Sequence, residues 1–358
     1  MSINKASTPA REVNAEQWLD WIFLAMFQRM HQIEEDNFDA ARYQGIPPNA
    51  FFADRHAAYL SFLVRHAGDF FRTRTLLVDE ASRLLFDQLV LFRLLDHLHV
   101  RLPYNNEETK TYNDIADGWR VQETDDAGLM GKLAIFDVPR MNDSSIRIKC
   151  WRENIAATFM CRPYYFNRDG YCVEPAAGEH IIDAGGCFGD TALAFAAVAG
   201  ESGHVYTFDP MPKHCAIIRE NLAMNPVLAS RISVHEFGLS NVERAGLGFA
   251  GQEGVINPGA TAFGDAVSTS TLDGLVTDGT VSRVDFIKMD VEGSELDALK
   301  GAEHIIRKDR PRLAISLYHR PEDFITIPLW IDQLDCGYRF FLDHYSMHHE
   351  ETILYARA

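Results

Sequence analysis

A glycine-rich turn between an apolar segment and an alanine-rich one is the first place where residue types and spacing indicate chemistry. Residues 183–191 read DAGGCFGDT. A strand, a glycine turn and a helix in this order form a nucleotide-type site at the carboxyl end of a strand in a parallel sheet. Glycine allows a ligand to approach the backbone closely and permits positive φ angles. The ligand-binding candidates in this turn are Asp183, Ala184, Gly185, Gly186, Gly189, Asp190 and Thr191.

The spacing of the glycines distinguishes two classes of ligand. A dinucleotide-binding turn has the pattern G-x-G-x-x-G, whereas position 187 is Cys. An acidic residue two positions before the first glycine, with another glycine four positions after it, resembles motif I of the S-adenosylmethionine (SAM) methyltransferases. Asp183 can face the positive sulfonium end of SAM, whereas it would repel a pyrophosphate. A tight turn that merely joins a strand to a helix is the alternative interpretation.

A second acidic residue follows the next apolar strand and could bind a ribose. Asp209 comes 26 positions after Asp183, directly after residues 204–208. An acidic side chain at this place can accept hydrogen bonds from both ribose hydroxyls. The alternative, a helix N-cap ahead of two prolines, is compatible with that role. A turn at 238–241 would lie beside the adenine in this fold. The cofactor-binding candidates at these two places are Phe208, Asp209, Pro210, Gly238 and Leu239.

Asp290, Glu292 and His319 are the candidates for the catalytic step. Asp290 follows the fourth strand, and the ends of strands one and four flank the crevice of an open parallel sheet. We therefore expect Asp290 to point toward the transferred methyl group and the substrate. Methyl transfer to oxygen is an in-line displacement that depends on alignment, and a general base assists by taking the proton of the alcohol. The alternative for Glu292 is a salt bridge or a charge at a helix N-terminus, and Glu295 is expected to be an N-terminal helix residue.

Histidines near acidic residues raise the question of a metal ion. His319, His344, His348 and His349 lie in the segments SLYHRPED and DHYSMHHEE. Their spacing matches no metal-ligand pattern, so we expect loop histidines near a substrate pocket and assign no metal ligand. A divalent ion held by Asp290 and a neighbour is the minor alternative.

Alternating strands and helices from residue 178 onward must position these side chains. The pattern predicts a mainly parallel sheet with helices on both faces, and the final two strands, which no helix joins, must be antiparallel. We therefore predict an α/β fold with the seven-stranded sheet of the class I methyltransferase Rossmann-like fold, its last strand antiparallel. The predicted strands are 180–183, 204–208, 232–237, 284–289, 312–317, 338–342 and 352–356, and the predicted helices are 190–199, 212–224, 294–307 and 322–334.

The first half of the chain is predicted to be organised differently. Aromatic and aliphatic residues occupy so much of a helix at 16–34 that we expect it to be largely covered. Residues 104–132 are polar and are predicted to be a loop. Tyr164, Tyr165 and Phe166 could cover a bound cofactor or fill the space under the sheet. The predicted units are an α-helical N-terminal domain over 1–103 (helices 16–34, 50–71 and 79–99), a linker with short β elements over 104–165, and a methyltransferase domain over 166–358.

Composition and charge narrow the class of partner. The chain has 358 residues and a formal net charge of −17, which argues against nucleic acid and anionic membranes because both require basic patches. Six cysteines without a C-x-x-C spacing indicate reduced thiols. The sequence contains no signal-peptide pattern and no membrane-spanning segment. We expect a cytoplasmic protein that acts on a small-molecule or glycan acceptor.

The motifs taken together resemble the FkbM family of SAM-dependent methyltransferases. The resemblance runs from about residue 165 to the C-terminus. Its most specific part is the pattern I-K-x-D-V-E-G-x-E-x-x-x-L-x-G within 286–301. The contributing segments are IIDAGGCFGDTALAFA, FDPMP, GLSN, STSTLDGL, VDFIKMDVEGSELDALKGAEHIIRKDRPRLAISLYHRPED and YRFFLDHYSMHHEETILYA.

This resemblance implies the class I methyltransferase fold and methylation of a hydroxyl oxygen on a sugar, glycolipid or polyketide. It implies that Asp183, Gly185 and Gly189 lie at the methionine end of SAM. Asp209 would then lie at its ribose, and Asp290 near the reacting centre. The family often has Glu where this chain has Asp209, which is one methylene shorter.

Two other functions are kept as alternatives. A nicotinamide-dependent Rossmann oxidoreductase would use the same strand, turn and helix, but the missing G-x-G-x-x-G opposes it. A non-catalytic methyltransferase-like protein would recruit partners through its N-terminal helices, and the intact turn with Asp209 and Asp290 opposes that. Apolar surface left on the N-terminal helices would favour a homodimer.

Overall fold

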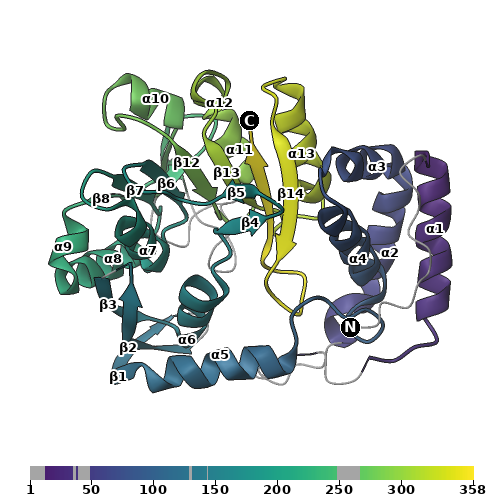
Figure 1. The fold of residues 1–358 in the computed structure, drawn as a ribbon, viewed down its shortest axis with the longest axis horizontal. Coiled ribbons are helices and arrows are strands. Elements are labelled where there is room, and N and C mark those ends of the chain that lie inside the picture. The colour runs from purple at the N-terminus through teal and green to yellow at the C-terminus, as the bar shows by residue number, and fades with distance from the viewer. Residues whose placement is uncertain (1–12, 35–37, 39–48, 129–130, 143, 248–266) are drawn as a thin grey trace.

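A seven-stranded sheet lies at the centre of the computed structural model of this chain (Figure 1). The structure describes residues 13–34, 38, 49–128, 131–142, 144–247 and 267–358. Neighbouring strands are parallel except where β15 pairs, antiparallel, with β13 and β14. The predicted class I methyltransferase sheet with its last strand antiparallel is therefore confirmed. In sheet order the strands are β14 (Arg339–His344), β15 (Thr352–Arg357), β13 (Arg312–Ser316), β12 (Phe286–Met289), β6 (His180–Ala184), β7 (His204–Phe208) and β8 (Ile232–His235).

Near-continuous apolar runs explain why the central strands lie in the interior. β6, β7 and β12 read HIIDA, HVYTF and FIKM, and every residue of β12 is buried. Such runs are typical of parallel strands that are covered on both faces. The helices of this half are α7 (Asp190–Ala199), α8 (Pro212–Met224), α9 (Pro226–Ala229), α10 (Leu272–Thr277), α11 (Glu295–Lys300), α12 (Glu303–Asp309) and α13 (Asp323–Gln333).

The two faces of the sheet pack against different partners. Residues of α10 to α13 and of the N-terminal helices form one hydrophobic cluster with the first face. Residues of α7 and of the three-stranded sheet within residues 120–150 form a second cluster with the other face. Two smaller sheets complete this half of the chain: β4 (Phe166–Arg168) with β5 (Tyr171–Val173), and β9 (Gly238–Leu239) with β10 (Arg244–Leu247) and β11 (Val267–Ser270).

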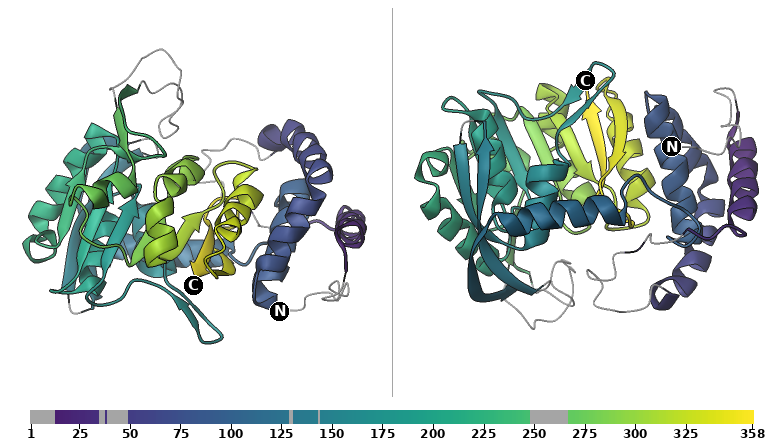
Figure 2. Two further views of the ribbon diagram at one scale, coloured as in Figure 1. Left: turned by 90° about the horizontal axis from the view of Figure 1, so that it is seen from above. Right: turned by 60° about the horizontal axis from the view of Figure 1, so that its bottom comes forward.

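The N-terminal helices lie beside the β14 edge of the sheet (Figures 1 and 2). The predicted helix at 50–71 is divided in two at His66. Asp79 caps the next helix, since its carboxylate accepts a hydrogen bond from the Ser82 N–H at 2.6 Å. The helices are α1 (Ala15–Arg29), α2 (Asn49–Arg65), α3 (Ala67–Leu76) and α4 (Glu80–Leu95).

The first helix is less covered than its sequence predicts. Trp18 and Ile22 are buried, but Phe27 is 61% exposed, and Ile33, beyond the helix end, is 76% exposed. The expectation of a largely covered helix was wrong because α1 packs chiefly on α3 and α4, at the outer edge of the molecule (Figure 1). One flank of a wide apolar helix therefore remains on the surface.

Direct contacts join the N-terminal helices to the sheet. The Val78 N–H donates to the Phe340 carbonyl at 3.0 Å, next to an isolated parallel bridge between Leu77 and Phe340. Phe86 of α4 stacks on Phe324 of α13 with ring centroids 4.6 Å apart. These helices thus share a hydrophobic cluster with the sheet. The predicted domain boundary at residue 103 stays a prediction.

Residues 104–132 do not form the predicted loop. They contain α5 (Asn106–Gly118) and β1 (Arg120–Gly128), and β1 pairs with β2 (Gly131–Met141), which pairs with β3 (Ser144–Cys150). The capping box made by Asn105 and Glu108 was a sequence signal for this helix. Only one residue of α5, Ala116, is buried, so the helix is polar almost throughout. This polar composition misled the prediction. A short helix, α6 (Arg152–Asn154), and a π-helix, η1 (Ile155–Cys161), follow β3.

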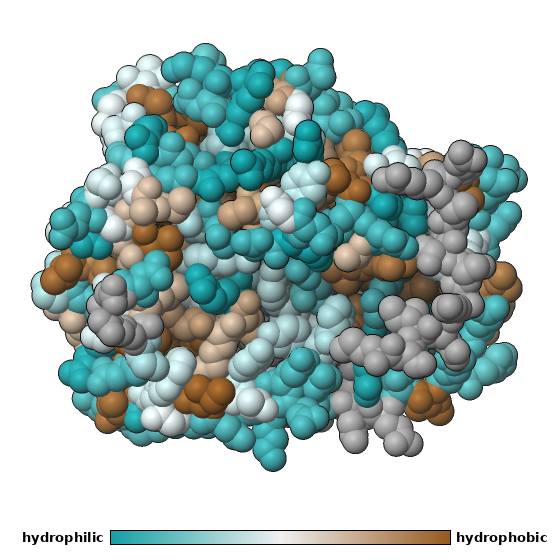
Figure 3. Space-filling model, viewed as in Figure 1, coloured by the Kyte–Doolittle hydropathy of each residue, from teal (hydrophilic) through white to brown (hydrophobic). Residues whose placement is uncertain are grey.

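The face of the molecule seen in Figure 3 is mostly hydrophilic, and hydrophobic residues appear on it as separate patches. None of the helices in the described part of the chain combines the length and the apolar character needed to cross a membrane.

Candidate active site

The glycine turn after β6 is shaped by contacts within the protein. Gly185 has a φ of +83°, and a side-chain Cβ there would lie 1.7 Å from the carbonyl oxygen of Asp290. A Cβ at Gly186 would lie 2.3 Å from the Thr207 hydroxyl. The turn is therefore packed between β7 and the loop that follows β12. Gly189, with a φ of +80°, is the N-cap of α7.

Asp183 is buried and makes its contacts with protein groups. It accepts hydrogen bonds from the hydroxyls of Thr191 and Thr207, each at 2.9 Å. The Lys288 ammonium lies 3.2 Å from Asp183 Oδ1 and donates to the carbonyl oxygens of Ala184 at 3.0 Å and Gly185 at 2.6 Å. The positive group nearest Asp183 is thus Lys288, so this carboxylate would influence a ligand mainly through the turn that it holds.

Lys288 is a functional candidate that the sequence interpretation missed. Burial disfavours its charge, but the carboxylates of Asp183 and Asp290 outweigh that effect and raise the pKa of Lys288. The signal was present, since a lysine interrupts the apolar strand FIKM. A charged residue in such a strand needs a partner, and Asp183 is opposite it in the β12–β6 register.

Asp209 follows β7 and also contacts the glycine turn. Its carboxylate accepts hydrogen bonds from the N–H groups of Cys187 and Met211, each at 2.9 Å, and lies 3.2 Å from His214 Nδ1. Asp209 therefore orders the chain just ahead of α8, but it is not the helix N-cap, which is Met211. Its ribose contact remains a prediction.

The other predicted cofactor residues differ in how close they lie to this turn. Phe208 is buried at the end of β7, where its ring stacks on His235 with centroids 4.7 Å apart. Asp190 is buried and accepts a hydrogen bond from the Thr158 hydroxyl of η1. Gly238 and Leu239 form β9 in a separate sheet, and their adenine role stays a prediction.

Asp290 lies at the carboxyl end of β12, where two tyrosine hydroxyls converge on it. Tyr164 donates to Oδ2 at 3.0 Å and Tyr318 donates to Oδ1 at 2.9 Å. His319 Nε2 lies 3.4 Å from Oδ1. The structure thus brings together Asp290 and His319, two of the candidates for the catalytic step, and adds the two tyrosines. Their catalytic roles stay predictions. Tyr164 also belongs to the hydrophobic cluster on this face of the sheet, which agrees with the role of filling space there. Its role as a cover for the cofactor stays a prediction.

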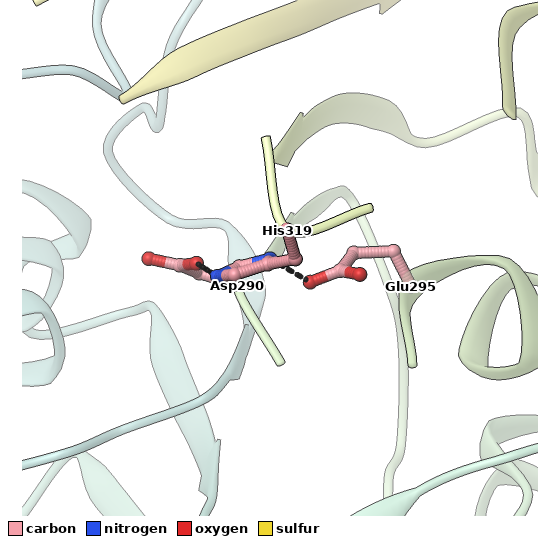
Figure 4. A group of neighbouring side chains, drawn as sticks. All are labelled: Asp290, Glu295 and His319. Carbon is pink, nitrogen blue, oxygen red and sulfur yellow. Dashed lines mark ion pairs between the residues drawn. The ribbon is translucent and has the colours of Figure 1, made fainter. Parts of the chain in front are cut away.

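Glu295, at the start of α11 as predicted, also has a contact that the sequence did not reveal. It is fully buried, and its Oε1 lies 2.8 Å from His319 Nδ1 (Figure 4). The same oxygen accepts a hydrogen bond from the Val291 N–H at 2.9 Å. Glu295 therefore fixes both the histidine and the loop that carries Asp290 and Glu292.

Burial and mutual contacts set the charges of this group. Burial lowers the pKa of His319, but Glu295 and the other nearby carboxylates outweigh it and raise this pKa to about 10. Burial raises the pKa of Asp290, but the charges of His319 and Lys288 together with the two tyrosine hydroxyls bring it below the usual value. His319 is thus a cation and Asp290 an anion at neutral pH.

Glu292 differs from Asp290 in its surroundings. Desolvation raises the pKa of Glu292 against the opposing charge of His319, whose Nε2 lies 3.5 Å away. The Glu292 side chain is 55% exposed, and its pKa is raised to about 7. A carboxylate with a raised pKa is a better proton acceptor near neutral pH than one with a lowered pKa. Of the two acids, Glu292 is the better general base.

Oxygen and nitrogen atoms of Asp290, Glu295 and His319 lie within 4.8 Å of one another and could hold a metal ion. However, the two imidazole nitrogens face different carboxylates (Figure 4). The imidazolium therefore stands where a cation would bind, and a metal would require His319 to lose its proton.

The C-terminal histidines lie elsewhere. His344 is buried in β14, where burial lowers its pKa to about 3. It is therefore neutral, and its Nδ1 lies 2.9 Å from the Thr352 hydroxyl. Within the described residues neither His344, His348 nor His349 joins the group around Asp290.

Comparison with known proteins bears on the fold and on one part of the chain. The fold is that of class I methyltransferases. Residues 183–340 match the model of the methyltransferase FkbM domain. The resemblance inferred from the motifs is thereby confirmed for residues 183–340, which are similar to the methyltransferase FkbM domain.

Solved structures show similarity in fold. The structure of methyltransferase FkbM from Methylobacillus flagellatus KT is 21% identical, with a TM-score of 0.53, over 83% of this chain and 60% of that one. This chain therefore spans well under two thirds of the length of that protein. Weaker matches are the O-methyltransferase from Bacillus cereus in complex with SAH (14% identical, 50% of this chain and 73% of that one, TM-score 0.32) and Aeropyrum pernix fibrillarin with bound SAM (13% identical, 66% and 97%, TM-score 0.33). A search of curated protein sequences found no match.

Proposed function

We propose that this protein is a SAM-dependent O-methyltransferase that methylates a hydroxyl group of a sugar, glycolipid or polyketide-type small molecule. The observation that carries the proposal is the contact between Gly185 and the backbone of Asp290. A ligand on the glycine turn would have its reactive end beside the acids that follow β12. The FkbM-type domain over 183–340 supports the same class of reaction.

The charges of the site support a cationic cofactor. Asp209 and Asp290 contribute negative charge, and the positive charge of Lys288 is offset by Asp183. A dinucleotide pyrophosphate would be repelled by this arrangement, which argues against the oxidoreductase alternative. The residues that would hold SAM are those of the turn at 185–189, with Asp209 toward its ribose. SAM bound there supplies an electrophilic methyl group on a positively charged sulfur.

The chain's own residues then have distinct tasks in the transfer. Glu292 takes the proton of the acceptor hydroxyl, because its raised pKa matches that task best. Asp290 is held by Tyr164 and Tyr318 and orients the acceptor. His319 stays protonated between Glu295 and Asp290 and keeps Asp290 in place. Alignment of the hydroxyl with the methyl group supplies much of the rate in such displacements.

Calorimetric titration with S-adenosylhomocysteine (SAH) tests the cofactor. We expect micromolar binding that is lost in Asp209→Ala and retained in Glu201→Ala, an exposed acid in the turn after α7. Binding of NAD instead of SAH would favour the oxidoreductase. A folded protein that binds neither would favour the non-catalytic alternative.

Transfer of a labelled methyl group from SAM to a panel of hydroxyl compounds tests the reaction. Asp290→Asn should abolish transfer while SAH still binds, because this side chain is assigned to the acceptor. Unchanged turnover in that variant would remove Asp290 from the mechanism. We assign no step to a metal ion, so a chelator should not change the rate.

We further propose a cytoplasmic protein that forms a homodimer. All six cysteines are unpaired, which suits a reducing compartment. The exposed flank of α1, with Leu24 and Phe27, is the surface proposed for the dimer. Sedimentation should give a dimer that Phe27→Glu dissociates, and a monomeric parent protein would remove this proposal.

A further inference from the structure

A cavity of about 160 Å³ lies between α5, η1 and the segment 345–351 that joins β14 to β15. Its lining includes Tyr104 and Tyr112 near one wall, Glu153 and Ala157 near a second, and Glu351 in the third. The cavity is smaller than the roughly 300–1,000 Å³ of sites for drug-sized ligands. It therefore suits a small compound or one end of a larger one.

Two of the segments that line the cavity lead to the tyrosines whose hydroxyls donate to Asp290. Pro163, in one wall, precedes Tyr164, whose hydroxyl donates to Asp290. On the other side, the carbonyl of Thr352, next to Glu351, accepts a hydrogen bond from the Leu317 N–H at 2.9 Å. Leu317 precedes the second tyrosine that donates to Asp290. Segments that line the cavity thus continue along the chain, or through one hydrogen bond, to the two tyrosines that hold Asp290.

The charge of Glu351, a lining residue, also affects the two tyrosines that hold Asp290. Burial and then the charge of Asp290 raise the pKa of Tyr164 and Tyr318, and the charge of Glu351 is a further cause for both. Glu351 therefore acts on the same two hydroxyls that hold Asp290.

The lining combines apolar surface with hydrogen-bonding side chains and two carboxylates. Glu153 and Glu351 are its acids, and Glu153 forms an ion pair with the neighbouring Arg152 at 3.0 Å. Among the described residues that line the cavity, none is Lys or Arg. The rings of Tyr104 and Tyr112 lie 6.0 Å apart, and the Tyr104 hydroxyl donates to Cys161 Sγ at 3.0 Å. Carboxylates and tyrosines exchange hydrogen bonds with hydroxyl groups, whereas a phosphate or carboxylate would meet like charge here.

The position of the cavity in the chain is equally informative. The described residues that line it all fall within 104–163 or 345–351, outside the FkbM-type domain at 183–340. The shared domain carries the proposed cofactor turn and the reacting acids. Segments outside that domain shape the cavity.

We propose that this cavity binds the methyl acceptor and selects hydroxyl-rich acceptors without acidic groups over phosphorylated or carboxylated ones. The inference rests on the proposed methyltransferase function. Selection comes from the acids of the lining, and the reaction itself comes from the residues that follow β12 and β13.

Competition experiments with labelled SAM test the selectivity. Neutral monosaccharides and polyols are offered together with their phosphate esters and acid derivatives. We expect methyl transfer to neutral members to exceed transfer to their acidic counterparts by about tenfold or more, because an acidic group would lie beside the carboxylates of the lining. Preference for acidic members, or no transfer to any neutral one by a protein that binds SAH, would overturn the inference.

Variants locate the selectivity in this cavity. Ala157→Trp fills the cavity and should lower kcat/KM for the acceptor by about tenfold or more without changing the SAH dissociation constant. Glu351→Lys should narrow the preference against phosphate esters, whereas Glu107→Gln, an exposed residue of α5 outside the lining, should not. Transfer and selectivity unchanged in both cavity variants would overturn the inference while leaving the methyltransferase function intact. A parent protein that does not bind SAH would instead overturn the proposed methyltransferase function.

Discussion

His319 and Glu295 form a buried ion pair in which Nδ1 lies 2.8 Å from Oε1, and the opposite nitrogen of the same ring faces Asp290. Nothing in the spacing of these three residues along the chain reveals this arrangement. It makes the histidine a fixed positive charge behind the reacting acid, and it has consequences that measurements can check.

The ion pair should make stability depend on alkaline pH. An ordinary histidine has a pKa of about 6.5, and the folded protein raises that of His319 to about 10. Protonated His319 therefore stabilises the fold fully below about pH 6.5, and this contribution is lost as the pH rises toward 10. Urea unfolding of the parent protein and of Glu295→Gln at several pH values between these limits tests it. We expect the free energy of unfolding to fall more steeply with pH in the parent, and parallel curves would contradict the assignment.

Glu292 should control the pH dependence of the rate. Because only its deprotonated form accepts a proton, kcat/KM should rise with pH through its raised pKa. Glu292→Gln should lower kcat by about 10²–10⁴-fold, the usual contribution of a general base. The rise of kcat/KM with pH should disappear in the same variant. Glu322→Gln, an exposed acid in the same region of the sequence as His319, is the control. A variant that keeps the parent pH profile would exclude Glu292 as the base.

Lys288 should matter for both stability and cofactor binding. Its ammonium is buried against Asp183 and holds two carbonyl oxygens of the glycine turn. Lys288→Met leaves the Asp183 charge uncompensated and should destabilise the fold by about 3–5 kcal/mol, with weaker SAH binding. Lys300→Met, on the exposed part of α11, should have little effect. Chemical unfolding and calorimetry measure the two effects, and normal values in Lys288→Met would show that the turn does not depend on it.

Gly185 and Gly279 offer a matched pair of backbone positions. Both have a φ of +83°, but a Cβ at Gly185 would overlap the Asp290 carbonyl, whereas nothing lies within 4 Å of one at Gly279. Gly279→Ala should cost only the left-handed backbone strain of about 1–2 kcal/mol. Gly185→Ala should cost clearly more and abolish SAH binding. Equal destabilisation of the two variants, measured by thermal and urea unfolding, would mean that the loop of Asp290 can move aside.

Local patterns in the sequence determined most of the sheet and the order of its motifs. Apolar runs such as HIIDA and FIKM, followed by glycine turns and helices, predicted the parallel strands and the antiparallel end. The acids at 183, 209 and 290 were identifiable because each directly follows or ends a strand. These features are local, so a single sequence reveals them. The same local reasoning failed for α5, where a polar surface helix resembled a loop despite its capping box.

The tertiary structure alone decided which groups meet. Tyr164 and Tyr318 lie 126 and 28 positions from Asp290, yet both hydroxyls donate to its carboxylate. Lys288 and Asp183 meet because β12 pairs with β6, although more than a hundred residues separate them. The cavity arises where α5 and η1 pack near the segment between β14 and β15. Contacts of this kind depend on how strands and helices pack, and that packing also sets the charges of Asp290, Glu292 and His319.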